Sequence, residues 1–185
     1  MSRTRNMVLC AMFTVLVAIG AFIRVPVPFV PFTLQVLFTT LAGLILGPKL
    51  GAMSVTLYVA LGLLGLPIFA SGGGIGYVFQ PTFGYLIGFI IGTYVTGSIA
   101  YQEENPSRKR LLVACLLGLF IVYFCGTSYY WFIMTFYLKS QIGLWTLFFY
   151  CVLLSAPGDI FLCFVTAGFG KRLLPIIRRE LEIGV

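Results

Sequence analysis

Long apolar stretches, separated by short polar segments, dominate the pattern along this 185-residue chain. The longest stretch runs from Leu50 to Gln102 and holds no Lys, Arg, Asp or Glu over 53 residues. A hydrocarbon core about 30 Å thick is crossed by roughly 20 apolar helical residues, so this stretch is long enough for two crossings. Four more stretches lack formal charge, namely Met7–Ile23, Val25–Pro48, Leu111–Leu138 and Ser140–Gly158. The pattern therefore predicts an integral membrane protein.

Continuous apolar runs favour α-helices, because the strands of a membrane barrel alternate lipid-facing and lumen-facing residues. Breaks at glycine, proline and charged residues divide the chain into six predicted transmembrane helices. Their expected bounds are Met7–Ile23, Thr33–Leu46, Ala52–Leu64, Pro81–Tyr101, Leu111–Met134 and Pro157–Lys171. We expect a single all-α bundle, with Gly143–Leu154 as a separate helical piece in the outer half of the membrane. Gly84, Gly88 and Gly92 recur every fourth residue, which predicts close helix packing within the chain.

Two segments between the predicted helices are rich in proline and glycine. Arg24–Pro31 holds three prolines, each of which fixes φ and lacks an amide donor, so we expect an extended outer loop. Gly65–Pro81 holds a glycine cluster that includes Gly73 and Gly74, and glycine lets the backbone approach a ligand closely. Aromatic and polar side chains flank the cluster, so we expect this loop to contact a ligand.

The distribution of charge predicts how the bundle is oriented. The chain is 60% hydrophobic and 9% charged, with a formal net charge of +7. Ten of its twelve basic residues fall in four patches on alternate loops, a pattern typical of cytoplasmic loops. The patches are Arg3 and Arg5; Lys49; Arg108, Lys109 and Arg110; and Lys171, Arg172, Arg178 and Arg179. We therefore expect a multi-pass protein of the cell membrane with both termini in the cytoplasm, and no binding of nucleic acid.

At this length we expect one membrane domain, 1–185, with a basic cytoplasmic tail at 172–185 that contacts membrane lipid. Histidine is absent, and the five cysteines lie in apolar runs without a CxxC pair, so no metal or cofactor is expected. Asp159 is the only acidic residue outside the inner loop and the tail. An ionisable residue within a membrane segment is costly, which marks Asp159 as functional. No catalytic partner accompanies it, so the sequence favours a binding protein over an enzyme.

Several motifs, taken in order, carry a resemblance to a known family. They are Val30-Pro31-Phe32-Thr33-Leu34-Gln35, Leu46-Gly47-Pro48-Lys49-Leu50-Gly51-Ala52, Gly65-Leu66-Pro67-Ile68-Phe69, Pro81-Thr82-Phe83-Gly84-Tyr85-Leu86 and Pro157-Gly158-Asp159. Together they cover essentially the whole chain and resemble the BioY family. Its members are the biotin-specific substrate-capture (S) components of energy-coupling factor (ECF) vitamin importers.

The resemblance implies a six-helix subunit that binds biotin from outside and works with a transmembrane coupling protein and two cytoplasmic ATPases. In the family a pocket aspartate, here Asp159, contacts the ureido ring of biotin. The polar residue before the P-T-x-G-Y motif, here Gln80, contacts the same ring. The predicted binding residues are Asp159, Gln80, Gly73, Gly74, Phe79, Gln35, Tyr85 and Tyr123.

Two departures from the family pattern affect these expectations. Leu162 stands where the family usually has a lysine that pairs with the biotin carboxylate. The carboxylate would then be met by Arg24, by Lys139 or by the backbone amides of Gly72–Gly74, or the ligand is a modified one. In addition, the A-x-x-x-A pattern that docks the family on its coupling protein is represented only by Ala11-x-x-x-Val15, with Cys10-x-x-x-Thr14 beside it.

A second function fits a lone membrane acid. Asp159 could be the protonation site of a self-contained, proton-coupled carrier. Against this stand the absence of an inverted repeat and of a second titratable group for a proton relay. Binding of biotin, and a requirement for ATP in uptake, distinguish the two hypotheses.

Overall fold

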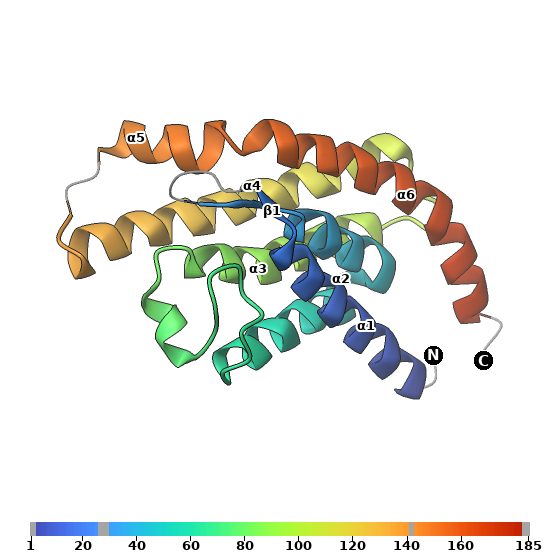
Figure 1. Cartoon of the computed structure of the whole chain (residues 1–185). Coiled ribbons are helices and arrows are strands. Elements are labelled where there is room, and N and C mark those ends of the chain that lie inside the picture. Colours follow the sequence, from blue (N-terminus) through green and yellow to red (C-terminus); the bar gives the residue numbers. More distant parts are fainter. Residues whose placement is uncertain (1–2, 26–29, 141–142, 183–185) are drawn as a thin grey trace.

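The computed structural model describes residues 3–25, 30–140 and 143–182 (Figure 1). Within these residues, five helical stretches are long and apolar enough to cross a membrane. The helices are α1 (Arg3–Phe22), α2 (Gln35–Leu63), α3 (Phe83–Ala100), α4 (Arg108–Phe132), the short α5 (Leu144–Phe148) and α6 (Ala156–Glu182). The remaining elements are strands β1 (Arg24–Val25) and β2 (Phe32–Thr33), a 3₁₀ turn at Ile75–Phe79, and π-helical turns at Ile133–Tyr137 and Phe149–Leu153.

Helix α2 is a hairpin of two arms, which correspond to the second and third predicted helices. Gly47 has φ of 80°, a left-handed conformation that glycine tolerates, and the following Pro48 has no amide hydrogen to continue the helix. The two arms lie side by side, as shown by the 2.9 Å hydrogen bond that Nε2 of Gln35 donates to the hydroxyl of Tyr58. On a straight helix these residues would lie about 35 Å apart. With α2 counted as two arms, the predicted six-helix bundle is confirmed.

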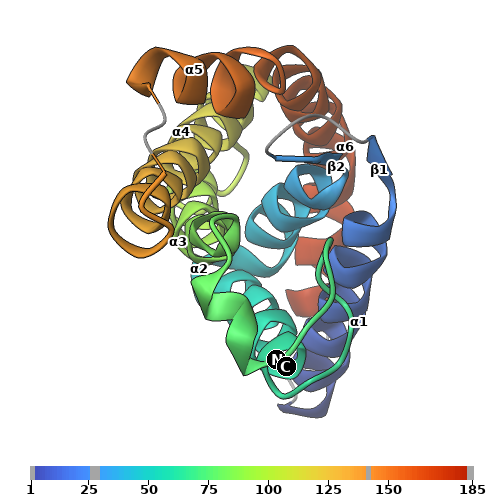
Figure 2. The ribbon, with the colours of Figure 1, turned by 60° about the vertical axis from the view of Figure 1, so that its left-hand side comes forward.

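Neighbouring helices in the sequence are neighbours in space. Helix α1 packs on α2, α2 on α3, and α3 on α4, while α6 closes the bundle by contacting both α2 and α4. Figure 2 shows these helices as a ring viewed close to its axis. The chain thus needs only short connections, as is usual for helical bundles.

The small-residue ladder of α3 packs on α4, as predicted. A Cβ atom on Gly88 would lie 2.8 Å from Cα of Val122, and one on Gly92 would lie 2.7 Å from the carbonyl oxygen of Gly118. Real Cβ atoms do not approach backbone so closely. The glycines therefore set the separation between the two helices.

Buried hydroxyls connect the helices by hydrogen bonds to backbone carbonyls. Thr14 donates to Ser54 O at 2.9 Å, Thr93 to Thr39 O at 3.2 Å and Thr96 to Ala114 O at 3.1 Å. Such bonds satisfy the polar groups where water is absent. They join α1 to α2, α2 to α3, and α3 to α4.

The basic loops meet at one end of the bundle, here called the basic end. The hydroxyl of Tyr101 donates to Ile45 O at 2.6 Å, which joins the end of α3 to the turn of α2. Nζ of Lys171 donates to Oδ1 of Asn105 at 2.6 Å, which joins α6 to the loop before α4. The first turn of α1 and the last turn of α6 also lie at this end (Figure 1). The proline- and glycine-rich segments lie at the opposite end, here called the loop end.

The predicted extended outer loop is a β-hairpin in its described part. Arg24 pairs with Thr33, and Val25 with Phe32, in an antiparallel two-stranded ladder. Two of the prolines on which the prediction depended, Pro26 and Pro28, lie outside the described residues.

Helix α6 is longer than predicted. It continues past Lys171 to Glu182, because Leu174 is buried in the main core and Leu173 packs near the base of α1 and α2. Apolar contacts thus extend the helix into the segment predicted as a tail, whose last residues, 183–185, lie outside the described range. Gly143–Leu154 is helical, as predicted, and is formed by α5 and a π-helical turn. It is less separate than predicted, because it leads directly into α6, and Trp145–Ile177 forms one stretch long and apolar enough to cross a membrane (Figure 1).

Gly88→Ala should lower the midpoint of thermal unfolding in detergent. The new methyl group would meet the backbone of Val122, and overpacking of this kind costs about 1–3 kcal/mol. Gly168→Ala in α6 is the matched control, because its Cβ would have nothing within 4 Å and alanine favours a helix by up to about 1 kcal/mol. Equal midpoints for the two variants would contradict the packing role of Gly88.

Candidate binding site

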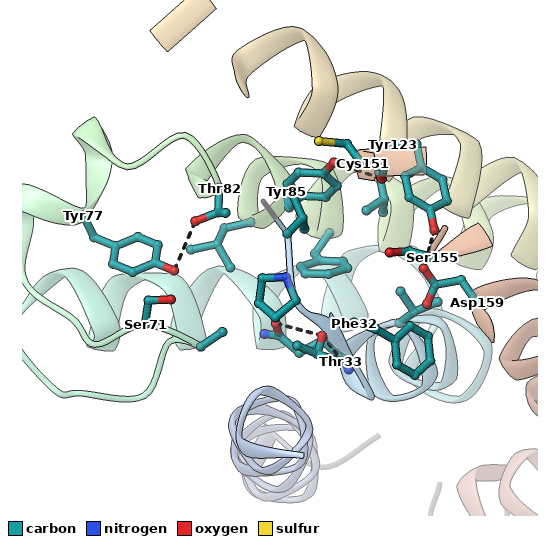
Figure 3. Close-up of a pocket in the computed structure, with 18 residues that line it drawn as sticks. Phe32, Thr33, Ser71, Tyr77, Thr82, Tyr85, Tyr123, Cys151, Ser155 and Asp159 are labelled. Carbon is teal, nitrogen blue, oxygen red and sulfur yellow. Dashed lines mark hydrogen bonds between the residues drawn. The ribbon is translucent and has the colours of Figure 1, made fainter. Parts of the chain in front are cut away.

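A cavity lies at the loop end of the bundle, and its lining includes Asp159 and several side chains with hydroxyl groups. The space between its walls is about 650 Å³, open solvent at its entrance included. Its walls come from the β-hairpin, the loop after α2, and helices α2, α3, α4 and α6 (Figure 3). The residues that line it are Val30, Pro31, Phe32, Thr33, Gln35, Val36, Ala70, Ser71, Tyr77, Thr82, Tyr85, Leu86, Phe89, Val122, Tyr123, Cys151, Ser155 and Asp159.

Asp159 is the acidic group of the cavity. It lies in the first turn of α6, as predicted, and its side chain is only 6% exposed. The hydroxyl of Tyr123 donates a 2.5 Å hydrogen bond to its Oδ2 (Figure 3). Its other oxygen, Oδ1, is buried and has no partner within the described residues. A buried carboxylate oxygen without a partner is costly, so the arrangement is suited to a ligand that donates a hydrogen bond.

Ser155 supplies a second unused polar atom one helical turn before Asp159. The backbone N–H of Asp159 donates to Ser155 O at 3.1 Å, so the two residues stand on the same side of the turn into α6. The Ser155 side chain is 5% exposed, and its Oγ has no partner in the described part of the chain. Ser155 was not among the predicted site residues. The spacing Ser155-x-x-x-Asp159 is the signal that could have identified it.

Aromatic rings cover the walls around this pair. The ring of Tyr85 lies directly over Gly126, and its hydroxyl donates to Cys151 O at 3.4 Å. The rings of Tyr85 and Tyr123 meet edge to face, with centroids 6.5 Å apart. The ring of Phe32 lies over Gly158, which explains a small residue next to Asp159. The acid is thus surrounded by largely apolar surface.

A chain of contacts attaches the loop after α2 to the bundle. The hydroxyl of Tyr58 accepts from Gln35 and donates to Ile68 O at 3.1 Å. The ring of Phe69 packs between Tyr58 and Tyr77, with centroid distances of 5.4 and 4.6 Å. Gln35 therefore holds the loop in place as well as lining the cavity.

The glycine cluster shapes this loop. Phe69 and Gly72 exchange backbone hydrogen bonds of 2.9 and 3.3 Å, which makes a tight turn with Ala70 and Ser71 at its tip. Gly72 and Gly74 have φ of 121° and 97°, conformations that favour glycine. The backbone N–H of Gly74 donates a 2.7 Å hydrogen bond to Gly62 O. The turn thereby brings its tip, rather than the glycines, to the cavity.

The structure brings together half of the predicted binding residues. Asp159, Gln35, Tyr85 and Tyr123 line the cavity. The other four, Gln80, Phe79, Gly73 and Gly74, are not part of its lining. They belong to the outer part of the same loop, where Gln80 is exposed and Phe79 stacks on Tyr137 with centroids 5.3 Å apart.

Among the described residues that line the cavity there is no lysine or arginine. Leu162 is 8% exposed and belongs to the hydrophobic core. Of the cations proposed in its place, Lys139 is exposed beyond the π-helical end of α4, whereas Arg24 donates to the carbonyl oxygen of Ala70, a lining residue. Across the described residues no group of His, Cys, Asp and Glu is arranged to hold a metal ion.

A multi-pass bundle with a partly open, largely apolar cavity and few polar groups is typical of a membrane protein that binds a small solute. The BioY family model matches residues 1–179. A probable biotin transporter BioY of Lysinibacillus sphaericus is 41% identical over 180 residues, covering 97% of this chain and 92% of that protein. The biotin transporter BioY of Thermotoga maritima is 42% identical over 137 residues, covering 74% and 78%.

A solved structure agrees with the sequence comparisons. The S-component for biotin from an ECF-type ABC transporter superposes with a TM-score of 0.78 at 26% identity, covering 94% of each chain. The chain belongs to the BioY family. It is a multi-pass membrane protein, and its relatives are transporters.

Removing the hydroxyl group of Tyr123 and removing that of Ser155 should have different effects on the stability of the protein. Tyr123→Phe should lower the thermal unfolding midpoint of the ligand-free protein, because a buried hydrogen bond to a carboxylate contributes about 1.5–3 kcal/mol. Ser155→Ala, the matched deletion, should leave the midpoint unchanged or raise it, because its hydroxyl makes no hydrogen bond. A larger loss from Ser155→Ala than from Tyr123→Phe would contradict this assignment.

Proposed function

We propose that this chain captures biotin at the loop end of the bundle, as the substrate-binding subunit of an ECF-type importer. The observation that carries the proposal is the buried carboxylate of Asp159, with one oxygen held by Tyr123 and the other unpartnered inside the cavity. The curated relatives and the biotin S-component among solved structures support the identity of the ligand.

The chemistry of biotin fits the polar atoms of the cavity. A ureido ring presents two N–H donors and one carbonyl acceptor. Oδ1 of Asp159 can accept from an N–H, and Oγ of Ser155 can either donate or accept. The apolar side chains of Phe32, Leu86 and Phe89 are suited to the thioether ring and the aliphatic chain.

The other predicted binding residues fall into two groups, which are supported by different observations. Tyr85 and Gln35 line the cavity, and we propose that they contact the ligand there. For Gln80, Phe79, Gly73 and Gly74 the support is the family resemblance and their place in the loop that reaches the cavity. We retain them as proposed binding residues on that basis.

The proposed partners are a transmembrane coupling protein and two cytoplasmic ATPases. Ala11 and Val15 are exposed on α1, and Val15 is 57% exposed, whereas Cys10 and Thr14 face into the bundle. This supports Ala11 and Val15 as the docking positions. We further propose that the basic end faces the cytoplasm of the cell and the cavity faces outward, since basic loops remain inside.

The comparisons favour an importer subunit over a self-contained, proton-coupled carrier. Asp159 serves in this proposal as a ligand-binding carboxylate rather than as a proton carrier. Biotin uptake by cells should therefore require the ATPase subunits.

Asp159→Ala should weaken biotin binding about tenfold to a hundredfold, because a hydrogen bond to a charged group contributes about 1.5–3 kcal/mol. Isothermal titration of purified protein in detergent measures the change. Glu104→Ala, in the exposed loop at the basic end, removes the same charge away from the cavity and should leave affinity unchanged. Unaltered affinity in the Asp159 variant would remove this residue from the site.

Val15→Trp should reduce co-purification with the coupling protein without changing biotin affinity, because a bulky ring at a close helix contact prevents approach. Val113→Trp is the matched control, since Val113 is 50% exposed on α4 and faces away from the bundle in the same way. Equal recovery of the coupling protein with both variants would place the docking surface elsewhere.

A further inference from the structure

We propose that Arg24, on the first strand of the β-hairpin, binds the carboxylate at the tail of the ligand and takes the role that Leu162 cannot fill. The inference rests on the proposed function, since it assumes a ligand with a ring at one end and a carboxylate at the other. It moves the anion-binding group from helix α6 to the β-hairpin, which forms part of the cavity wall.

The cavity has two distinct polar ends. Figure 3 shows Asp159, Ser155 and Tyr123 together at one end and Ser71 and Tyr77 at the other. The unpartnered oxygens of Asp159 and Ser155 lie at the first end, so a ring that donates hydrogen bonds belongs there. The tail of an elongated ligand then points toward the turn that carries Ser71.

Helix α6 cannot supply a cation for that tail. Leu162 packs in the hydrophobic core and is absent from the cavity lining. None of the described residues that line the cavity is a lysine or an arginine. Of the backbone N–H groups of Gly72–Gly74, which could also bind an anion, those of Gly72 and Gly74 already donate to Phe69 O and Gly62 O. Gly73 is not part of the described cavity lining.

Arg24 is attached to two residues of the cavity lining. Its backbone pairs with Thr33 across the β-ladder, and its Nη1 donates to the carbonyl oxygen of Ala70. Both Thr33 and Ala70 line the cavity. The guanidinium group is thereby held beside the turn toward which the ligand tail points.

The guanidinium group retains the capacity to bind an anion. It carries five N–H donors in a fork that matches a carboxylate, and the recorded contact with Ala70 uses one nitrogen. Glu103 pairs with Arg110 at the basic end, and Asp159 is the only acidic residue of the sequence outside the inner loop and the tail. Thus no protein carboxylate competes for Arg24 in the described part of the loop end, where Asp159 is held by Tyr123.

The test compares biotin with biotinamide, which has the same ring and chain but no negative charge. Arg24→Gln should weaken biotin binding about tenfold or more while changing biotinamide binding less than about threefold, because charge-assisted bidentate pairs are roughly twice as strong as neutral ones. Arg24→Lys should retain part of the preference, since it keeps the charge and loses the fork. Lys139→Gln, which removes the other cation near this end, should have no effect on either ligand.

Losses of similar size for both ligands would overturn the inference and leave Arg24 as a residue that only shapes the hairpin. The wild-type protein provides a test that does not depend on folding of a variant. It should prefer biotin to biotinamide, and added salt should reduce this preference because Arg24 is exposed. Equal wild-type affinity for the two ligands would overturn the role of Arg24 while upholding the proposed function, whereas absence of binding to both would overturn the proposed function itself.

Discussion

A carboxylate buried within an apolar helical bundle is the constraint around which this structure is arranged. Asp159 lies in the first turn of α6, where the helix N-terminus stabilises negative charge, and Tyr123 on α4 holds one of its oxygens. The second oxygen has no protein partner among the described residues. Such a group is expensive in a membrane unless a ligand completes it. The packing of α6 against α4 brings Tyr123 to this carboxylate, and the loops form the rest of the cavity that the carboxylate lines.

The loops that close the cavity depend on contacts made deep in the bundle. Tyr58 joins Gln35 to the backbone at Ile68, and Phe69 packs beside it. These contacts bring the tip of the Phe69–Gly72 turn to the cavity, where Ala70 and Ser71 line the wall. Irregular backbone near a membrane is tolerated only where it is buried in protein or lines a cavity, and here the same contacts satisfy that requirement. The loop is therefore an ordered part of the cavity wall.

The apolar pattern alone predicted the number and order of the helices, because a bilayer imposes length and hydropathy on each crossing. It also identified Asp159, since a lone acid in an apolar run is conspicuous in any sequence of this kind. The packing role of Gly84, Gly88 and Gly92 could also be predicted, because it depends on a local property, the absence of side chains on one face of a single helix. The extent of α6 was misjudged, because the apolar contacts that extend it come from distant segments.

The sequence by itself determined the class of fold, the acidic group and, through the motifs, the family. Only the tertiary structure decided which residues share the cavity with Asp159. Ser155 and the turn at Ala70 line it, while Gln80 lies outside and Leu162 packs in the core. Whether a side chain faces the cavity depends on how loops fold across helices that are distant in the chain. Periodicity records which face of a helix is apolar, but it holds no information on how loops from distant segments close over that face.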